Sequence, residues 1–145
     1  MGPHQLVYIV DDNEAVLDST GMLVKSAGIA VREFSSSLAF LRDFEAAPEC
    51  CVILDINMPE MSGFRVIEFL RGRGITVPII LFSGRVDAVA EERARRSGAE
   101  ALLTKPVAHD ELLQLVQRLL ARSNVAHAVA PLPPIIAGEL PRLAH

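Results

Sequence analysis

The chain has 145 residues, half of them hydrophobic, with 14 Lys and Arg against 18 Asp and Glu. A chain of this length suits one α/β domain that buries roughly two thirds of its unfolded surface, and its composition excludes a disordered polymer. The net charge of −4 argues against nonspecific nucleic-acid binding. No hydrophobic run approaches the roughly 18 residues of a membrane span.

Short hydrophobic runs alternate with longer segments of helical period along the first part of the chain. The run at 6–10 precedes a helix that Gly28 ends. The run at 29–34 precedes a second helix, which the serines at 35–37 can cap. The run at 51–54 has no polar alternation and therefore predicts a strand buried on both faces. The hydrophobic sides of the two helices are expected to be Val16, Thr20, Leu23, Val24 and Ala27, and then Leu38, Leu41 and Phe44.

The same alternation continues in the second part of the chain. Ser62 can cap a third helix, and the run at 77–82 predicts a fourth strand. The helical segment 87–97 is highly charged, so we expect it to be the least firmly docked helix. The run at 101–104 predicts a fifth strand before a last amphipathic helix. The hydrophobic residues expected to dock these helices are Phe64, Ile67 and Leu70, then Val89, then Leu112, Leu115, Val116 and Leu119.

Strands and helices that alternate in this way predict parallel βαβ units and a three-layer, doubly wound α/β fold. Residues 5–122 are expected to form this domain. Residues 123–145 are expected to be a proline-rich tail or linker, or alternatively an extended segment that docks in a partner's groove. The neighbouring Cys50 and Cys51 are expected to be reduced thiols, which suits a cytoplasmic protein, and the N-terminus shows no sign of a signal peptide.

Polar side chains follow four of the five predicted strands. Because the carboxyl ends of parallel strands meet at one edge of the sheet, we expect these side chains to lie together, whereas the second strand, which ends at Phe34, should lie off-centre. Each also has a simpler interpretation, as a helix cap, a turn residue or a lysine reaching for solvent. The polar residues are Asp11, Asp12, Asp55, Ser83 and Lys105.

Three carboxylates at one edge would repel one another unless a cation lay among them, and hard oxygen ligands without His or Cys favour Mg²⁺. Asp55, at the end of the buried central strand, is the best candidate nucleophile toward a phosphoryl group. Lys105 can supply a fixed positive charge and Ser83 a hydrogen bond to the phosphoryl oxygens.

Four segments together resemble the receiver domains of bacterial two-component response regulators: 10–12 (Val-Asp-Asp), 55–63 (Asp-Ile-Asn-Met-Pro-Glu-Met-Ser-Gly), 82–84 (Phe-Ser-Gly) and 104–106 (Thr-Lys-Pro). The resemblance implies a five-stranded sheet of order 2-1-3-4-5. It implies that Asp55 accepts a phosphoryl group from a phosphohistidine on a sensor histidine kinase or phosphotransfer protein.

The resemblance also implies a set of ligands and loop residues. Mg²⁺ would be held by Asp12, Asp55 and the backbone carbonyl of Asn57, with Asp11 assisting through water. The loop after Asp55 would be shaped by Met58, Pro59 and Gly63, and the bond before Pro106 would be cis.

In this family the hydroxyl at Ser83 is coupled to an aromatic residue three positions before the lysine, and here that position is Leu102. We therefore expect Ser83 to move toward the phosphoryl group while Leu102 or the loop at Arg85 repacks. The resemblance places the surface for an output partner or a homodimer on the fourth helix, fifth strand and fifth helix.

Three interpretations of function remain open. The main one is a phosphorylation-controlled switch, either a stand-alone receiver or the receiver of a DNA-binding regulator. Residues 5–110 resemble receivers that are attached to helix-turn-helix output domains. Residues 123–145 are too few for a helix-turn-helix output domain, so the chain itself is not expected to bind DNA. A phosphohydrolase would need a carboxylate two residues beyond its nucleophile, where this chain has Asn57 or Asn13. We thus expect only slow self-dephosphorylation. A flavodoxin-type binder would need a phosphate loop after the first strand, where Asp11 and Asp12 would repel phosphate.

Overall fold

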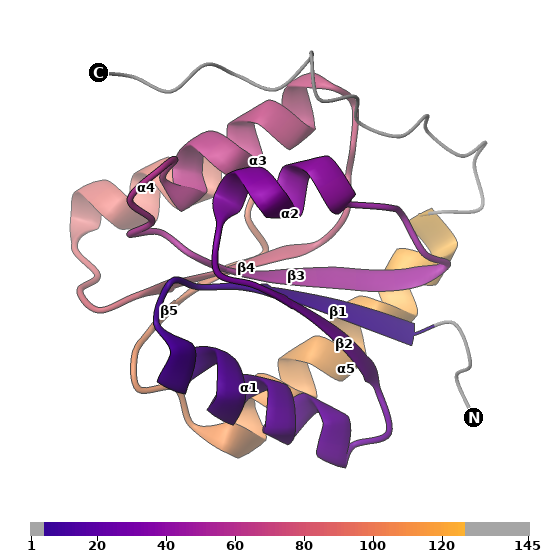
Figure 1. The fold of residues 1–145 in the computed structure, drawn as a ribbon. Helices are drawn as coiled ribbons and strands as arrows, with labels where there is room; N and C mark the ends of the chain where they lie inside the picture. Colours follow the sequence, from indigo (N-terminus) through magenta and orange to yellow (C-terminus); the bar gives the residue numbers. More distant parts are fainter. Residues whose placement is uncertain (1–4, 127–145) are drawn as a thin grey trace.

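A computed structural model describes residues 5–126 as a five-stranded parallel sheet with helices on both faces (Figure 1). The strand order is β2-β1-β3-β4-β5, as expected. The strands are β1 (Gln5–Val10), β2 (Ala30–Phe34), β3 (Glu49–Asp55), β4 (Ile79–Ser83) and β5 (Ala101–Thr104). The helices are α1 (Glu14–Ser26), α2 (Ser37–Asp43), α3 (Gly63–Gly72), α4 (Ala88–Ser97) and α5 (His109–Ala126).

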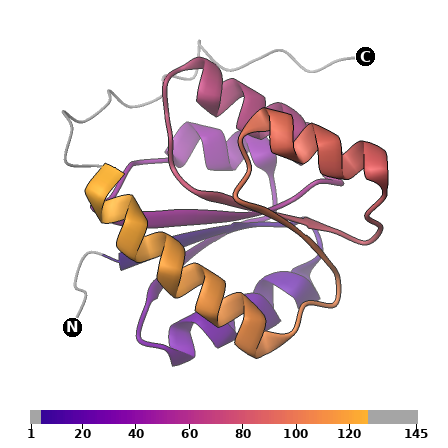
Figure 2. The same cartoon turned by 180° about the vertical axis from the view of Figure 1, so that it is seen from behind.

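The sheet separates two hydrophobic cores. Helices α2, α3 and α4 cover one face, and α1 and α5 cover the other, where they lie next to each other (Figures 1 and 2). Successive residues of the central strands point to opposite faces, so that Cys50 belongs to the first core and Cys51 to the second. Every residue of β3 after Glu49 is buried, which confirms the strand predicted to be covered on both sides.

The two cysteines form no disulfide, as predicted. Burial raises the pKa of the Cys50 thiol to about 12 and raises that of Cys51 further, so neither is a reactive thiolate. Among the described residues, no helix combines the length and the hydrophobicity needed to cross a membrane.

The helix faces differ from expectation at a few positions. In α1 the buried side is Leu17, Thr20, Gly21 and Val24; the expectation was wrong for Ala27, which is exposed beyond the end of the helix. In α2 the prediction omitted Phe40, which is fully buried. An aromatic cluster explains this burial, because the Phe40 ring packs edge-on against Tyr8 with centroids 5.4 Å apart.

Helix α4 has one buried residue, Ala94, while Val89 is 78% exposed. This confirms the prediction that α4 is weakly docked. Two arginine side chains add contacts between α4 and α3. The Arg71 side chain donates a hydrogen bond to the Gly98 carbonyl at 3.0 Å, and the Arg93 guanidinium lies 4.6 Å from the Phe64 ring centroid.

Helix α5 buries its predicted leucines and Val116 and continues to Ala126. Residues 123–126 of the expected tail thus belong to α5, and residues 127–145 lie outside the described residues. The boundary at 122 and the tail stay predictions.

Candidate functional site

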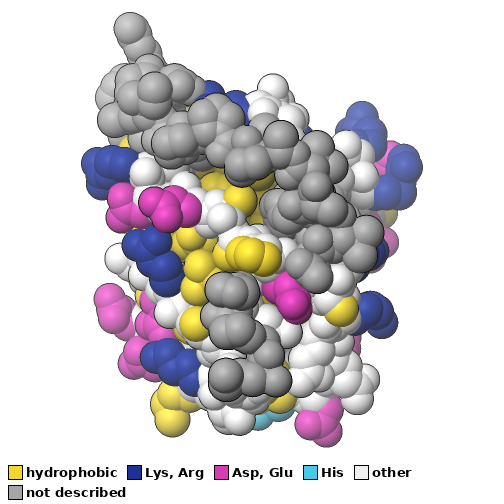
Figure 3. Space-filling model, turned by 90° about the vertical axis from the view of Figure 1, so that its right-hand side faces the viewer, with side chains coloured by type: hydrophobic (Ala, Val, Ile, Leu, Met, Phe, Trp, Pro, Cys, Tyr) yellow, Lys and Arg dark blue, Asp and Glu magenta, His cyan; other side chains and the backbone are white. Residues whose placement is uncertain are grey.

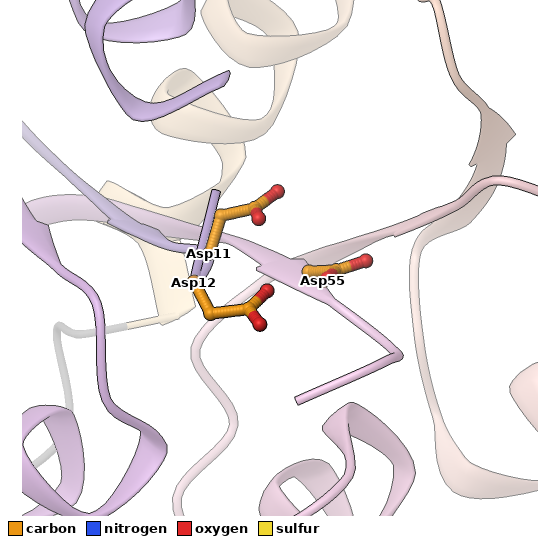
Figure 4. Close-up of side chains that lie close together, drawn as sticks. All are labelled: Asp11, Asp12 and Asp55. Atoms are coloured by element: carbon orange, nitrogen blue, oxygen red, sulfur yellow. The ribbon is translucent and has the colours of Figure 1, made fainter. Parts of the chain in front are cut away.

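The ends of β1 and β3 bring three carboxylates together. The two strands are neighbours in register, with Val10 opposite Leu54, so Asp11 and Asp55 end up beside each other. One oxygen from each of Asp11, Asp12 and Asp55 lies within 4.8 Å of the others, and the three side chains point to the same side of the sheet edge (Figure 4). Asp11 and Asp55 are buried, and Asp12 is exposed. The convergence inferred from strand order is therefore present for these three residues.

Lys105 from the end of β5 reaches the same cluster. Its Nζ lies 2.8 Å from Asp11 Oδ2 and 3.3 Å from Asp55 Oδ1. Its backbone N–H donates to the Ser83 carbonyl at 2.8 Å, which fixes the end of β5 against β4. Burial alone would lower the pKa of Lys105, but the hydrogen bond to Asp11 and the charges of Asp55 and Asp11 outweigh it and raise that pKa. The ammonium is thus a fixed positive charge rather than a solvated chain end.

The negative charge of the Asp55 carboxylate is only partly balanced by Lys105. Burial raises the pKa of the Asp55 carboxyl and the charge of Asp11 raises it further, while Lys105 opposes both. Although the ammonium lies 3.3 Å away, Asp55 Oδ1 is buried and accepts no hydrogen bond from the described residues. The Lys105 contact is therefore an ion pair without hydrogen-bond geometry. A cation coordinated by oxygen atoms would satisfy this atom, so the residues present fit Mg²⁺.

Asp11 differs from Asp12 in how its oxygens are used. Asp11 Oδ1 accepts the Asn13 N–H at 2.9 Å, and Oδ2 accepts the hydrogen bond from Lys105. The cap of α1 is Asn13, whose side chain accepts from the backbone N–H groups of Ala15 and Val16. The simpler interpretation of this segment as a helix cap therefore holds for Asn13, which leaves the exposed Asp12 carboxylate available to a ligand.

The Ser83 hydroxyl is engaged with its own loop. It donates to the Arg85 carbonyl at 2.6 Å and accepts the Arg85 N–H at 3.1 Å. This is the turn chemistry that the sequence left as an alternative. Leu102, at the expected aromatic position, is half-buried and packs against the core on the α2–α4 side.

The loop between β3 and α3 packs tightly against the end of β3. A Cβ on Gly63 would lie 2.6 Å from the Asp55 carbonyl oxygen, closer than real Cβ atoms come, so only glycine fits there. Met58 is buried, Pro59 and Asn57 are exposed, and the Asn57 N–H interacts with the Asp55 carboxylate. The Lys105–Pro106 peptide bond is cis, as the resemblance implied.

Sequence reasoning missed Ser37. Its side chain is fully buried, and its hydroxyl donates to the Met61 carbonyl in the β3–α3 loop at 2.9 Å. The prediction treated the three serines at 35–37 as interchangeable caps, whereas Ser36 is the cap of α2. A helix needs one capping residue, so the presence of three consecutive serines was the signal that one of them has another role.

A hollow of about 310 Å³ opens beside the cluster, between α1 and the start of α5. Its lining is mainly apolar and includes Val16, Leu23, Val107 and Lys105. At the opposite end of the sheet, the described side chains of both charges are interspersed around hydrophobic ones (Figure 3). That face shows no gathering of basic side chains among its described residues.

Comparison with known proteins identifies the group to which this site is similar. Residues 7–117 match the family described as response regulator receiver domain. The chain is 39% identical over 126 residues to response regulator protein TodT of Pseudomonas putida, covering 87% of this chain and 56% of TodT. It is 32% identical over 117 residues to transcriptional regulatory protein FixJ of Azorhizobium caulinodans, covering 81% of this chain and 56% of FixJ.

Among solved structures, response regulator StyR is similar with a TM-score of 0.79 and 30% identity, over 86% of this chain and 63% of that one. The chain spans little more than half the length of the two curated relatives. The similarity therefore concerns one part of those longer proteins.

Proposed function

Because the chain belongs to the family of response regulator receiver domains, we propose that it is a phosphoacceptor switch and that Asp55 takes the phosphoryl group from a phosphohistidine. Receiver domains of this family interact with kinases and output domains and bind Mg²⁺ at an acidic pocket. One observation carries the proposal. Asp55 lies buried at the end of the central strand, with the Lys105 ammonium at 3.3 Å and two further carboxylates within 4.8 Å.

The proposed reaction needs an ionised Asp55. One carboxylate oxygen attacks the phosphorus, an O–P bond forms and the N–P bond to the donor imidazole breaks. The electron pair stays on the imidazole nitrogen, and the product is an acyl phosphate on Asp55. Lys105 favours the ionised form of Asp55 and offers its charge to a phosphoryl oxygen. Bound Mg²⁺, held by Asp12, Asp55 and the Asn57 carbonyl, would neutralise further oxygen charge.

The hollow beside Lys105 supports an approach by a donor protein from the α1 side. Its apolar lining offers burial to hydrophobic side chains of a partner that presents the phosphohistidine. The donor class remains as the sequence suggested, a sensor histidine kinase or a phosphotransfer protein.

The read-out is proposed to begin at Ser83. If its hydroxyl turns to a phosphoryl oxygen, it gives up both contacts with Arg85 and releases the loop that leads to Asp87, the cap of α4. Since α4 buries one residue, moving this helix requires little free energy. The surface of α4, β5 and α5 would then bind an output partner or a second copy of the chain, with Leu102 repacking in place of an aromatic ring.

The output is proposed to be transcriptional and to reside outside this chain. FixJ is named a transcriptional regulatory protein, and the matched region is little more than half of it. This favours the interpretation of the chain as the receiver of a DNA-binding regulator. The buried thiols Cys50 and Cys51 suit the reducing cytoplasm in which such a regulator would act.

A phosphohydrolase is the less favoured alternative. The residue two positions beyond Asp55 is Asn57, which is unable to exchange a proton as a catalytic carboxylate does. We therefore propose that the chain only slowly loses its own phosphoryl group and does not turn over substrate.

The test is incubation of the whole chain with acetyl phosphate, with and without Mg²⁺, followed by intact-mass measurement. We expect a Mg²⁺-dependent adduct with the mass of one phosphoryl group, absent in Asp55→Asn and present in Asp18→Asn, which changes an exposed carboxylate on α1. Labelling that persists in Asp55→Asn would refute the assigned nucleophile. Rapid multiple-turnover release of phosphate from small esters would favour the hydrolase.

A further inference from the structure

The junction between β2 and α2 contacts both loops that carry the acidic cluster. On one side, the Phe34 carbonyl accepts the Asp11 N–H at 3.0 Å. On the other, the Ser37 hydroxyl donates to the Met61 carbonyl at 2.9 Å, and the Ser36 hydroxyl donates to the Glu60 carboxylate. Four consecutive residues, 34–37, thus connect the loop of Asp11 and Asp12 with the loop of Asn57.

Of these contacts, the one from Ser37 is the most costly to lose. Ser37 is 0% exposed and Met61 is 3% exposed, so water is poorly placed to replace the hydroxyl if it is removed. A buried carbonyl left without its donor destabilises the folded arrangement, and a loop relieves that penalty by moving. The Ser36 contact with Glu60 is exposed and is worth less.

The rest of the β3–α3 loop has its anchors at its two ends. The Ile56 carbonyl accepts the Met58 N–H at 3.1 Å and the Gly63 N–H at 2.8 Å. Between these points the exposed Asn57 has little packing of its own. The hydrogen bond from Ser37 is therefore the buried contact that ties this loop to the β2 side of the domain, next to the exposed contact from Ser36 to Glu60.

We propose that Ser37 is a positioning residue for the metal site, which sets the distance between the Asn57 loop and Asp12 and thereby the affinity and selectivity for Mg²⁺. This inference rests on the proposed function, since it presupposes that a divalent cation is bound by Asp12, Asp55 and the Asn57 carbonyl. Ser37 lies outside the set of proposed ligands and outside the four motifs of the family resemblance.

Selectivity separates positioning from a general loss of stability. Mg²⁺ demands near-ideal octahedral geometry with short bonds, whereas Ca²⁺ accepts longer bonds and variable coordination. A shifted loop should therefore weaken Mg²⁺ binding more than Ca²⁺ binding. A substitution that only lowers the stability of the folded protein leaves the ratio of the two dissociation constants unchanged.

The experiment is calorimetric titration of the whole chain with MgCl₂ and with CaCl₂, for the wild type, Ser37→Ala and Ser35→Ala. Ser35 is exposed in the same segment and serves as the matched control. Thermal unfolding in EDTA establishes that each variant is folded. We expect Ser37→Ala to raise the Kd for Mg²⁺ about three- to tenfold, below the range for direct partners of ligands, and that for Ca²⁺ less than about twofold. Ser35→Ala should change neither.

If Ser37→Ala does not fold, Ser37→Cys retains the size and a weak donor, and its Kd for Mg²⁺ should rise while that for Ca²⁺ does not. A wild type that binds no Mg²⁺ overturns the proposed function and this inference with it. The inference alone is overturned if the wild type binds Mg²⁺ and the Ser37 variant binds both ions as tightly as the wild type does. It is also overturned if the variant loses affinity for both ions by the same factor.

Discussion

Replacing Asp55 by Asn is expected to stabilise the protein against unfolding when divalent cations are removed. The buried carboxylate faces two like charges within 4.8 Å and one ammonium at 3.3 Å, and its Oδ1 accepts no hydrogen bond from the described residues. The amide of Asn carries no charge and has nearly the same shape. The substitution therefore removes repulsion without opening a cavity, and Lys105 keeps its hydrogen bond to Asp11 at 2.8 Å.

The size of the effect follows from these distances. At an effective dielectric constant of about 20, each like-charge pair, taken at the upper limit of 4.8 Å, costs about 3.5 kcal/mol, and the Lys105 pair at 3.3 Å contributes about 5 kcal/mol of attraction. The balance is a net repulsion of about 2 kcal/mol. Asp12 is exposed and water screens its share, so we expect Asp55→Asn to gain about 1–2 kcal/mol, or about 3–8 °C in Tm.

The assay is urea and thermal unfolding followed by far-ultraviolet circular dichroism in EDTA, because the chain has no Trp. With Mg²⁺ at about a hundred times its Kd the wild type should gain about 2.7 kcal/mol and the variant little, so the order of stability reverses. Asp18→Asn should stay within about 0.5 kcal/mol of the wild type in both conditions.

The pH dependence gives an independent check. Burial raises the pKa of Asp55 in the folded state, which means that the folded protein holds this proton more tightly than the unfolded chain. The destabilisation by charged Asp55 is therefore full above the folded pKa and is lost as the pH falls through it toward the ordinary value of 3.8. The advantage of Asp55→Asn should shrink over the same range. A variant less stable than the wild type in EDTA at neutral pH would refute the electrostatic reasoning.

Three further predictions follow from the site. Lys105→Met should slow acetyl phosphate labelling of Asp55 about ten- to a hundredfold at saturating Mg²⁺, because it removes the fixed charge beside the nucleophile; an unchanged rate would show that this charge is dispensable. Gly63→Ala should cost about 1–3 kcal/mol in urea unfolding since its Cβ would meet the Asp55 carbonyl, whereas Gly72→Ala, with open space around it, should be neutral or slightly stabilising; equal effects would contradict the tight contact. A structure with beryllofluoride on Asp55 should show the Ser83 hydroxyl turned from Arg85 to the fluoride, and an unmoved Ser83 would reject the proposed read-out.

The strand order and the acidic cluster were predictable because they depend on patterns with few solutions. Five hydrophobic runs separated by helical segments allow few parallel topologies, and polar residues placed directly after Val10 and Leu54 meet at one edge whatever the helices do. The sequence could not show that Asp11 is saturated by Asn13 and Lys105 while Asp12 is available, since both precede the same helix.

Other features depend on contacts between distant segments. Ser35, Ser36 and Ser37 are equivalent as helix caps, and only the packing of α2 against the β3–α3 loop distinguishes the buried Ser37. Phe40 was omitted although Ser37, Phe40, Leu41 and Phe44 follow the helical period, so its burial beside Tyr8 and Phe44 could have been predicted from the sequence. The docking of α4 through Arg71 and Arg93 likewise joins residues of two helices that the sequence does not pair.

The central claim is that Asp55 carries the phosphoryl group. The most direct measurement is to treat the acetyl phosphate-labelled chain with borohydride, which reduces an acyl phosphate to an alcohol and so converts the labelled aspartate into homoserine. Peptide sequencing by tandem mass spectrometry then identifies the position. The account predicts homoserine at position 55, dependent on Mg²⁺. Homoserine at position 11 or 12, with Asp55 intact, would contradict it.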